Sequence, residues 1–146
     1  VLLIDGMTTE VIADCVHLPP TILRLVYKLK GVSRTALVTA ALRYAAYEGE
    51  ELAFSKVYID NGVCKFKSDD TVAGGISTMD QLVRNMVIRA DVPFEDAVRM
   101  ASETPARIMN VIDRVGTLEK GKDADILMLD KQYNITSVWS KGVRIF

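Results

Sequence analysis

Residues 9–39 read TEVIADCVHLPPTILRLVYKLKGVSRTALVT, and this stretch decides the fold. Residues 9–14 have the character of a short strand, which a proline pair ends before a helix begins. Apolar residues recur at helical spacing over 21–30, and residues 36–39 resemble a buried strand. A strand, a helix and a strand with short links predict a βαβ unit with parallel strands and a right-handed crossover.

The composition of the chain is that of an ordinary globular domain. Of its 146 residues, 49% are apolar and 25% are charged, close to the average for folded proteins. These values exclude a disordered tail, a collagen-like repeat and a coiled coil. A chain of this length can bury roughly 68–70% of its unfolded surface, which is enough for a hydrophobic core.

The charge balance argues against nucleic-acid and membrane partners. The chain has 18 Lys and Arg residues, 19 Asp and Glu residues and a net charge of −1, so it has neither a basic excess nor a polybasic segment. No apolar run approaches the ~18–20 residues that cross a bilayer. The two cysteines, Cys15 and Cys64, form no C-x-x-C pair and predict free thiols in a reducing cytoplasm.

The rest of the chain predicts an antiparallel excursion, three helices and a closing set of strands. Apolar segments at 52–59 and 63–67 flank Asn61-Gly62, a strong hairpin signal, and we expect the excursion to end at a flexible turn over 73–75. Thr104 is expected to cap the third helix, with proline at its first position. The predicted helices cover 78–90, 94–102 and 104–111, and the predicted strands cover 124–129, 134–139 and 142–146, with a turn at Lys141-Gly142.

Few polar residues are candidates for chemistry. His17 is the only histidine, which excludes a zinc site built from two or three histidines of this chain. It is either a structural histidine or a site residue. Its place directly after a predicted strand favours the site residue, because α/β folds place their sites at the ends of strands. Asp14 is either a catalytic carboxylate or a residue that holds its neighbouring loop. The pair Gly74-Gly75 either forms a flexible turn or presents backbone N–H groups to an anion or a sugar.

Two segments near the C-terminus resemble the amidohydrolase superfamily. Residues 116–130, GTLEKGKDADILMLD, have the form Gly-x-Leu-x-x-Gly-x-x-Ala-Asp followed by apolar residues and Asp, which is similar to the closing motif of that superfamily. Residues 101–106, ASETPA, resemble the helix that precedes this motif. Both motifs are structural, and they name no substrate.

Three further segments are similar to the N-acetylglucosamine-6-phosphate deacetylases of that superfamily. Residues 12–17, IADCVH, resemble their Ile-Ala-Asp-Gly-x-His, and residues 37–42, LVTAAL, resemble their Leu-Val-Thr-Asp-Ala-Met. Residues 73–80, AGGISTMD, resemble their Ala-Gly-Ser-x-x-Thr-Met-Asp. The order and spacing follow the C-terminal part of that family.

The resemblance implies an α/β fold, namely the C-terminal part of a (β/α)8 amidohydrolase barrel plus strands of a small β-sandwich domain. A complete barrel needs about 250 residues, so we expect the last two barrel strands and the helices that follow them. The implied domains are 1–114, the barrel part with a β-hairpin excursion near 50–70, and 115–146, the closing strands of the small domain.

The resemblance also implies a reaction, the hydrolysis of the acetamido group of N-acetylglucosamine-6-phosphate in amino-sugar catabolism. Such reactions use a divalent metal, zinc or iron here, to polarise the carbonyl and activate water. The family's metal ligands come from earlier strands, so we expect no metal in this chain alone. His17 corresponds to the family's substrate-contacting histidine, and Gly75 and Ile76 to its substrate loop. Ala40 stands at the position of the catalytic aspartate, which acts as general base and then as acid.

Departures from the family pattern leave alternatives open. Ala40 cannot take up a proton, so the chain alone is expected to be inactive, and Cys15 in place of glycine and Gly75 in place of serine alter the substrate loop. One alternative is a non-catalytic homologue with a binding or assembly role. Another is a different amidohydrolase, such as a deaminase or a dihydroorotase, against which residues 12–17 and 78–80 argue. Strands without neighbours predict a homo-oligomer.

Overall fold

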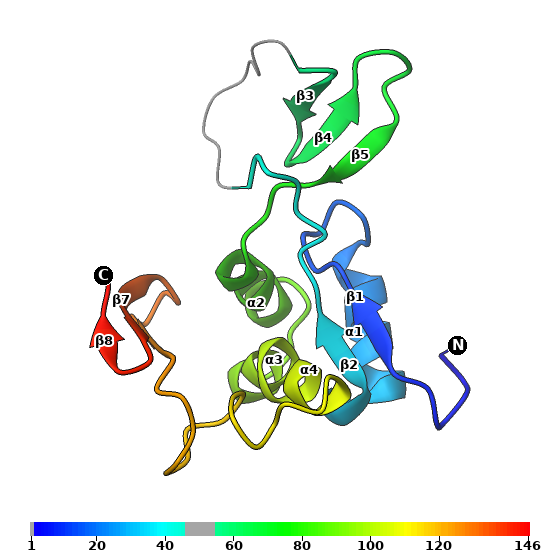
Figure 1. The fold of residues 1–146 in the computed structure, drawn as a ribbon. Coiled ribbons are helices and arrows are strands. Elements are labelled where there is room, and N and C mark those ends of the chain that lie inside the picture. Colours follow the sequence, from blue (N-terminus) through cyan, green and yellow to red (C-terminus); the bar gives the residue numbers. More distant parts are fainter. Residues whose placement is uncertain (1, 46–54) are drawn as a thin grey trace.

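The computed structural model describes residues 2–45 and 55–146. Within this part of the chain the strands form sheets of order β1-β2, β3-β4-β5 and β6-β7-β8. Figure 1 shows β1, β2 and the helices at the centre, with the β3–β5 sheet standing apart at one end and the C-terminal strands at the side.

The βαβ unit that the sequence predicts is confirmed. Strands β1 (Thr9–Val11) and β2 (Thr35–Leu37) pair in parallel, with Thr9 opposite Thr35. Helix α1 (Pro20–Lys30) and the 3-10 turn Val32–Arg34 connect them. Gly31 ends α1 at φ 72°, in the left-handed region that favours glycine.

The main core lies between this unit and the helices α2 (Met79–Ile88) and α3 (Phe94–Ala101). Helix α2 begins with a capping box, in which the Thr78 backbone N–H donates to Gln81 Oε1 at 3.0 Å, so the predicted cap at Thr78 is confirmed. The most deeply buried apolar side chains of this core are Ala13, Leu23, Leu82, Met86, Ala90, Ala97 and Met100.

The predicted cap of the third helix is wrong. Helix α4 (Glu103–Ile108) begins before Thr104, which is buried inside it. The Thr104 hydroxyl donates to the Val32 carbonyl at 2.8 Å and so ties α4 to the turn before β2. Asn110 takes φ 55° just beyond the helix, which therefore ends earlier than the predicted residue 111.

The excursion is a three-stranded antiparallel sheet. Strands β3 (Val57–Asp60) and β4 (Val63–Phe66) form the predicted hairpin, and Asn61 and Gly62 at its tip both have positive φ, at 48° and 82°. Residues 52–54 of the predicted strand lie outside the described residues. The expectation of a flexible turn over 73–75 is wrong, because β5 (Val72–Gly75) pairs with β4.

The C-terminal strands form the predicted antiparallel sheet. They are β6 (Ile126–Leu129), β7 (Ile135–Ser140) and β8 (Val143–Arg144). Lys141 and Gly142 make the turn between the last two, with φ 50° and 79°. Strands β6 and β8 are shorter than the predicted segments, and β7 is shifted by one residue, because the ends of a strand depend on hydrogen-bonded pairing and not on the side-chain pattern alone.

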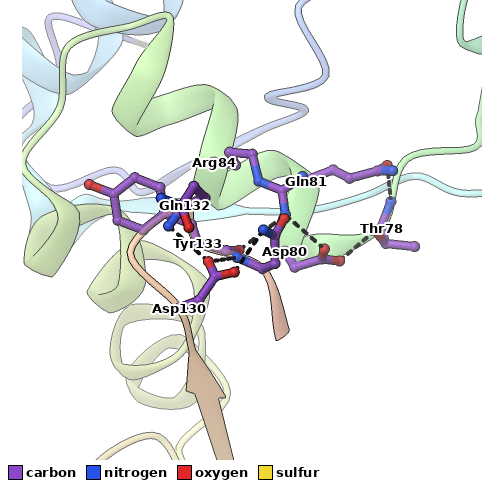
Figure 2. A network of polar contacts seen from close by, with 8 residues as sticks. Thr78, Asp80, Gln81, Arg84, Asp130, Gln132 and Tyr133 are labelled. Carbon is purple, nitrogen blue, oxygen red and sulfur yellow. Dashed lines mark hydrogen bonds and ion pairs between the residues drawn. The ribbon is translucent and has the colours of Figure 1, made fainter. Parts of the chain in front are cut away.

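A polar network joins this sheet to α2, as Figure 2 shows. Arg84 Nη2 donates to the Tyr133 carbonyl at 3.0 Å and to Asn134 Oδ1 at 3.1 Å. Asp130 fixes the shape of the β6–β7 loop, because its carboxylate accepts hydrogen bonds from the backbone N–H groups of Gln132 and Asn134. The Tyr133 ring also stacks on Phe94 at a centroid distance of 5.1 Å. Helix α2 therefore holds the β6–β7 loop through Arg84, and helix α3 holds it through the Phe94 ring.

Many large apolar side chains of the described residues remain exposed. They include Leu25 and Leu29 on α1, Leu127 and Met128 on β6, and Ile145 and Phe146 at the end. No helix in the described ranges is long and apolar enough to cross a membrane.

Leu23→Ala tests the position of the core. The Leu23 side chain is 1% exposed and belongs to the main core, so its truncation should lower the free energy of unfolding by about 2–5 kcal/mol. Leu25→Ala is the matched control on the same helix, where the side chain is 46% exposed, and should change that free energy by no more than about 0.5 kcal/mol. Urea unfolding followed by circular dichroism measures both, and equal losses would contradict the packing described.

Candidate functional site

Three loops meet beyond the C-terminal ends of β1 and β2. The chain after β2 runs beside the end of β5, where Ala41 and Gly75 form an isolated parallel bridge. The Gly75 N–H donates to the Ala40 carbonyl at 3.1 Å, and the Leu42 N–H donates to the Gly75 carbonyl at 2.9 Å. This junction brings the sequence-predicted residues Ala40 and Gly75 into direct contact.

The loop after β1 is organised by Asp14. Its side chain is fully buried, and Oδ1 accepts the backbone N–H groups of Val16 and His17, each at 2.9 Å. Oδ2 lies 2.6 Å from Nδ1 of His17, whose side chain is 25% exposed. Of the two interpretations of Asp14, the structure shows the one in which it holds its neighbouring loop. These contacts also turn the chain, so β1 ends at Val11 instead of continuing to residue 14.

Gly75 lies between the two strand-end loops. A Cβ atom added to it would lie 2.9 Å from the Thr39 carbonyl oxygen and 3.9 Å from Oδ2 of Asp14. A residue without a side chain therefore lies against the 39–40 backbone and close to the Asp14 carboxylate. One interpretation of the glycine pair was that it presents backbone N–H groups to an anion or a sugar. The Gly75 N–H instead donates to the Ala40 carbonyl, so it is not free to bind an anion.

Ala40 is exposed and has φ 43°. Its methyl group offers no acid or base. The left-handed conformation is one that aspartate and asparagine adopt more readily than other L-residues. The backbone at this position thus suits the aspartate that the resemblance assigns to it.

The other predicted site residue, Ile76, is half-buried and packs with Val57 and Cys64 in the core of the excursion sheet. Its backbone follows Gly75 directly, but its side chain belongs to that separate core. The structure therefore does not bring the Ile76 side chain together with Asp14, His17 and Ala40.

Two features of the site were missed from the sequence. Asn85 on α2 donates from Nδ2 to the Ala13 carbonyl at 3.0 Å, which anchors the end of β1 from a residue 72 positions away. Its place three residues after Leu82, on the apolar face of the predicted helix, was the available signal. Cys15 has φ 64°, a conformation that costs an L-residue roughly 1–2 kcal/mol and that explains the glycine in the resembling family. Burial raises the pKa of the Cys15 thiol.

The described residues do not fit a metal-binding site. Within 2–45 and 55–146, no three His, Cys, Asp or Glu side chains gather so that they could hold a metal ion. One ring nitrogen of His17 is engaged by Asp14. Burial raises the pKa of the neighbouring Cys15 thiol, so Cys15 is a poor source of the thiolate that would bind a metal. No step of a reaction is therefore assigned to a metal held by these residues.

Gly75→Ala tests the close approach at the junction. The new methyl group would meet the Thr39 carbonyl at 2.9 Å, so we expect a loss of about 1–3 kcal/mol in the free energy of unfolding. Gly6→Ala is the control, because no atom lies within 4 Å of the position of its added Cβ. Chemical denaturation of both variants compares them, and a Gly75→Ala protein as stable as the control would refute the contact.

Comparisons with known proteins agree on one family. Residues 3–145 match the model of the amidohydrolase family. The N-acetylglucosamine-6-phosphate deacetylase of Haemophilus influenzae is 32% identical over 138 residues, which are 92% of this chain and 36% of that protein. The chain thus spans about a third of the length of this relative and of the N-acetylglucosamine-6-phosphate deacetylase of Bacillus subtilis, to which it is 29% identical.

Solved structures show the same relationship. The N-acetylglucosamine-6-phosphate deacetylase of Pasteurella multocida superposes with a TM-score of 0.88 at 29% identity, covering 98% of this chain and 38% of that one. An aspartate-to-alanine mutant of the Mycobacterium smegmatis enzyme, in complex with N-acetyl-D-glucosamine-6-phosphate, superposes with a TM-score of 0.85 at 31% identity, covering 98% and 39%. Motifs, fold and family model coincide along almost the whole chain, which belongs to the amidohydrolase family.

Proposed function

We propose that this chain supplies the sugar-phosphate-binding side of a hydrolase that removes the acetyl group from N-acetylglucosamine-6-phosphate. The observation that carries the proposal is the junction of Gly75 with Ala40 beside the Asp14–His17 pair. These residues lie far apart in sequence, and each stands in a segment similar to the deacetylases. The relatives with solved structures carry that activity in their names.

Each site residue has a proposed role. His17 contacts the substrate through Nε2, the ring nitrogen that Asp14 does not engage. Gly75 and Ile76 line the substrate loop, with Gly75 leaving space where a side chain would stand. Ala40 occupies the place of the general base, and its methyl group moves no proton. Binding without efficient turnover is the expected behaviour of this set.

The proposed domain arrangement follows the family. Residues 1–114 would be the last part of a (β/α)8 barrel, with β1 and β2 as its final strands, and residues 115–146 would belong to the small β-domain. The exposed apolar side chains on α1 and β6 support association into a homo-oligomer. The two free cysteines support a reducing cytoplasm as the location.

The family's metal defines the first test. Bound zinc or iron would polarise the amide carbonyl and activate water in the complete enzyme, but the described residues offer no ligand set. We therefore expect elemental analysis of the 146-residue chain, after gel filtration, to find no stoichiometric zinc or iron. One metal ion per chain that survives dialysis would contradict the proposed division of the site.

Ala40→Asp tests the lost base. In a complete, metal-loaded protein that carries this chain, the change should raise acetate release from N-acetylglucosamine-6-phosphate by about 10²–10⁴-fold, the usual worth of positioned acid–base catalysis. Ala40→Asn is the matched control, because it suits the same left-handed backbone but cannot exchange a proton at neutral pH.

The same pair of variants separates two explanations. Asparagine should leave acetate release at the alanine level, and the isolated chain should gain nothing from aspartate because we expect it to hold no metal. An Ala40→Asp protein that binds the sugar phosphate and holds metal, yet hydrolyses no faster, would rule out the proposed role of position 40.

A further inference from the structure

The contacts of Asp14 settle which of its oxygens faces the imidazole. The backbone N–H groups of Val16 and His17 can only donate, and both use Oδ1 at 2.9 Å. Oδ2 is then left for Nδ1 of His17 at 2.6 Å. Because the Asp14 side chain is fully buried, water does not compete for either oxygen.

This arrangement also decides where the ring proton lies. An ionised carboxylate only accepts hydrogen bonds, so Nδ1 must carry a proton whether the ring is neutral or charged. The opposite neutral tautomer would set the lone pair of Nδ1 against that of Oδ2. In the neutral ring, Nε2 is consequently the nitrogen without a proton.

We propose that Asp14 is a positioning residue that holds neutral His17 in the Nδ1–H tautomer, so that every proton exchanged by the ring is on Nε2, away from Asp14. Neutral His17 then accepts a hydrogen bond from a ligand hydroxyl, and protonated His17 donates one to an anionic oxygen. That the ligand is a sugar phosphate rests on the proposed function, whereas the tautomer does not.

Other groups near the loop support its rigidity. Asn85 fixes the Ala13 carbonyl immediately before Asp14, and Gly75 places its backbone against the Oδ2 side of the carboxylate. Together with the two backbone N–H groups on Oδ1, these neighbours keep Oδ2 directed at Nδ1 of His17. The tautomer is thus a consequence of tertiary packing around one buried carboxylate.

Nitrogen-15 NMR of the 146-residue chain tests the proposal directly, because His17 is its only histidine and its ring signals need no assignment. For the neutral ring, the wild-type spectrum should show the proton on Nδ1 and none on Nε2. A wild-type ring with its proton on Nε2 would overturn the proposal without any variant.

Asp14→Asn should exchange the two nitrogens. Its single amide oxygen should stay with the two backbone N–H groups, which turns the amide NH2 towards Nδ1 and forces Nδ1 to accept. The proton then moves to Nε2, as expected when an amide replaces the carboxylate that orients a histidine. Asp91→Asn is the control, since that exposed carboxylate pairs with Arg24, and it should leave the Nδ1–H tautomer unchanged.

A folded Asp14→Asn protein that keeps the Nδ1–H tautomer would refute the positioning role, and circular dichroism decides whether it is folded. If the variant does not fold, the wild-type spectrum alone decides the inference. Titration with N-acetylglucosamine-6-phosphate is a separate arm. Wild-type Nε2 should shift on binding, and the absence of a shift in a chain with the expected tautomer would count against the proposed function only.

Discussion

The parallel pairing of β1 with β2 is the constraint on which the site depends. Because parallel strands end at the same edge of a sheet, the loop that holds Asp14 and His17 and the loop that holds Ala40 emerge side by side. A crossover helix packed on the core fixes this register. The excursion sheet then returns the chain to the same edge, where the Gly75 bond to Ala40 closes the junction.

Backbone groups, more than side chains, assemble this region. Main-chain hydrogen bonds join Gly75 to Ala40 and Leu42. Asp14 Oδ1 accepts hydrogen bonds from backbone N–H groups, and the Asn85 side chain donates one to a backbone carbonyl. Each such hydrogen bond contributes about 0.5–1.5 kcal/mol to the free energy of unfolding, so the junction is stabilised by several weak interactions together. At position 40 the backbone has φ 43°, a left-handed conformation that suits an aspartate as well as the alanine that stands there.

The C-terminal sheet is attached to the same helix that braces the site. Helix α2 receives the excursion at its N-terminus, anchors β1 through Asn85 and holds the β6–β7 loop through Arg84. Figure 2 shows how the capping residues of α2 and the Asp130 loop share one polar region. A movement of α2 would therefore shift both the C-terminal end of β1 and the β6–β7–β8 sheet.

The sequence by itself determined the elements whose signals are local. Helical spacing in 21–30, the Asn61-Gly62 turn and the Thr78 cap all act within a few residues, and the structure has each of them. The motifs also predicted that His17, Ala40 and Gly75 belong to one site, and the structure brings Gly75 against Ala40 and close to Asp14, the partner of His17. Only tertiary structure decided what depends on distant partners. Thr104 bonds to Val32 instead of capping α4, residues 73–75 pair with β4 instead of flexing, and Asp14 serves the loop and His17. The physical reason is that a buried polar group takes the partner that packing brings to it, and no local pattern names that partner.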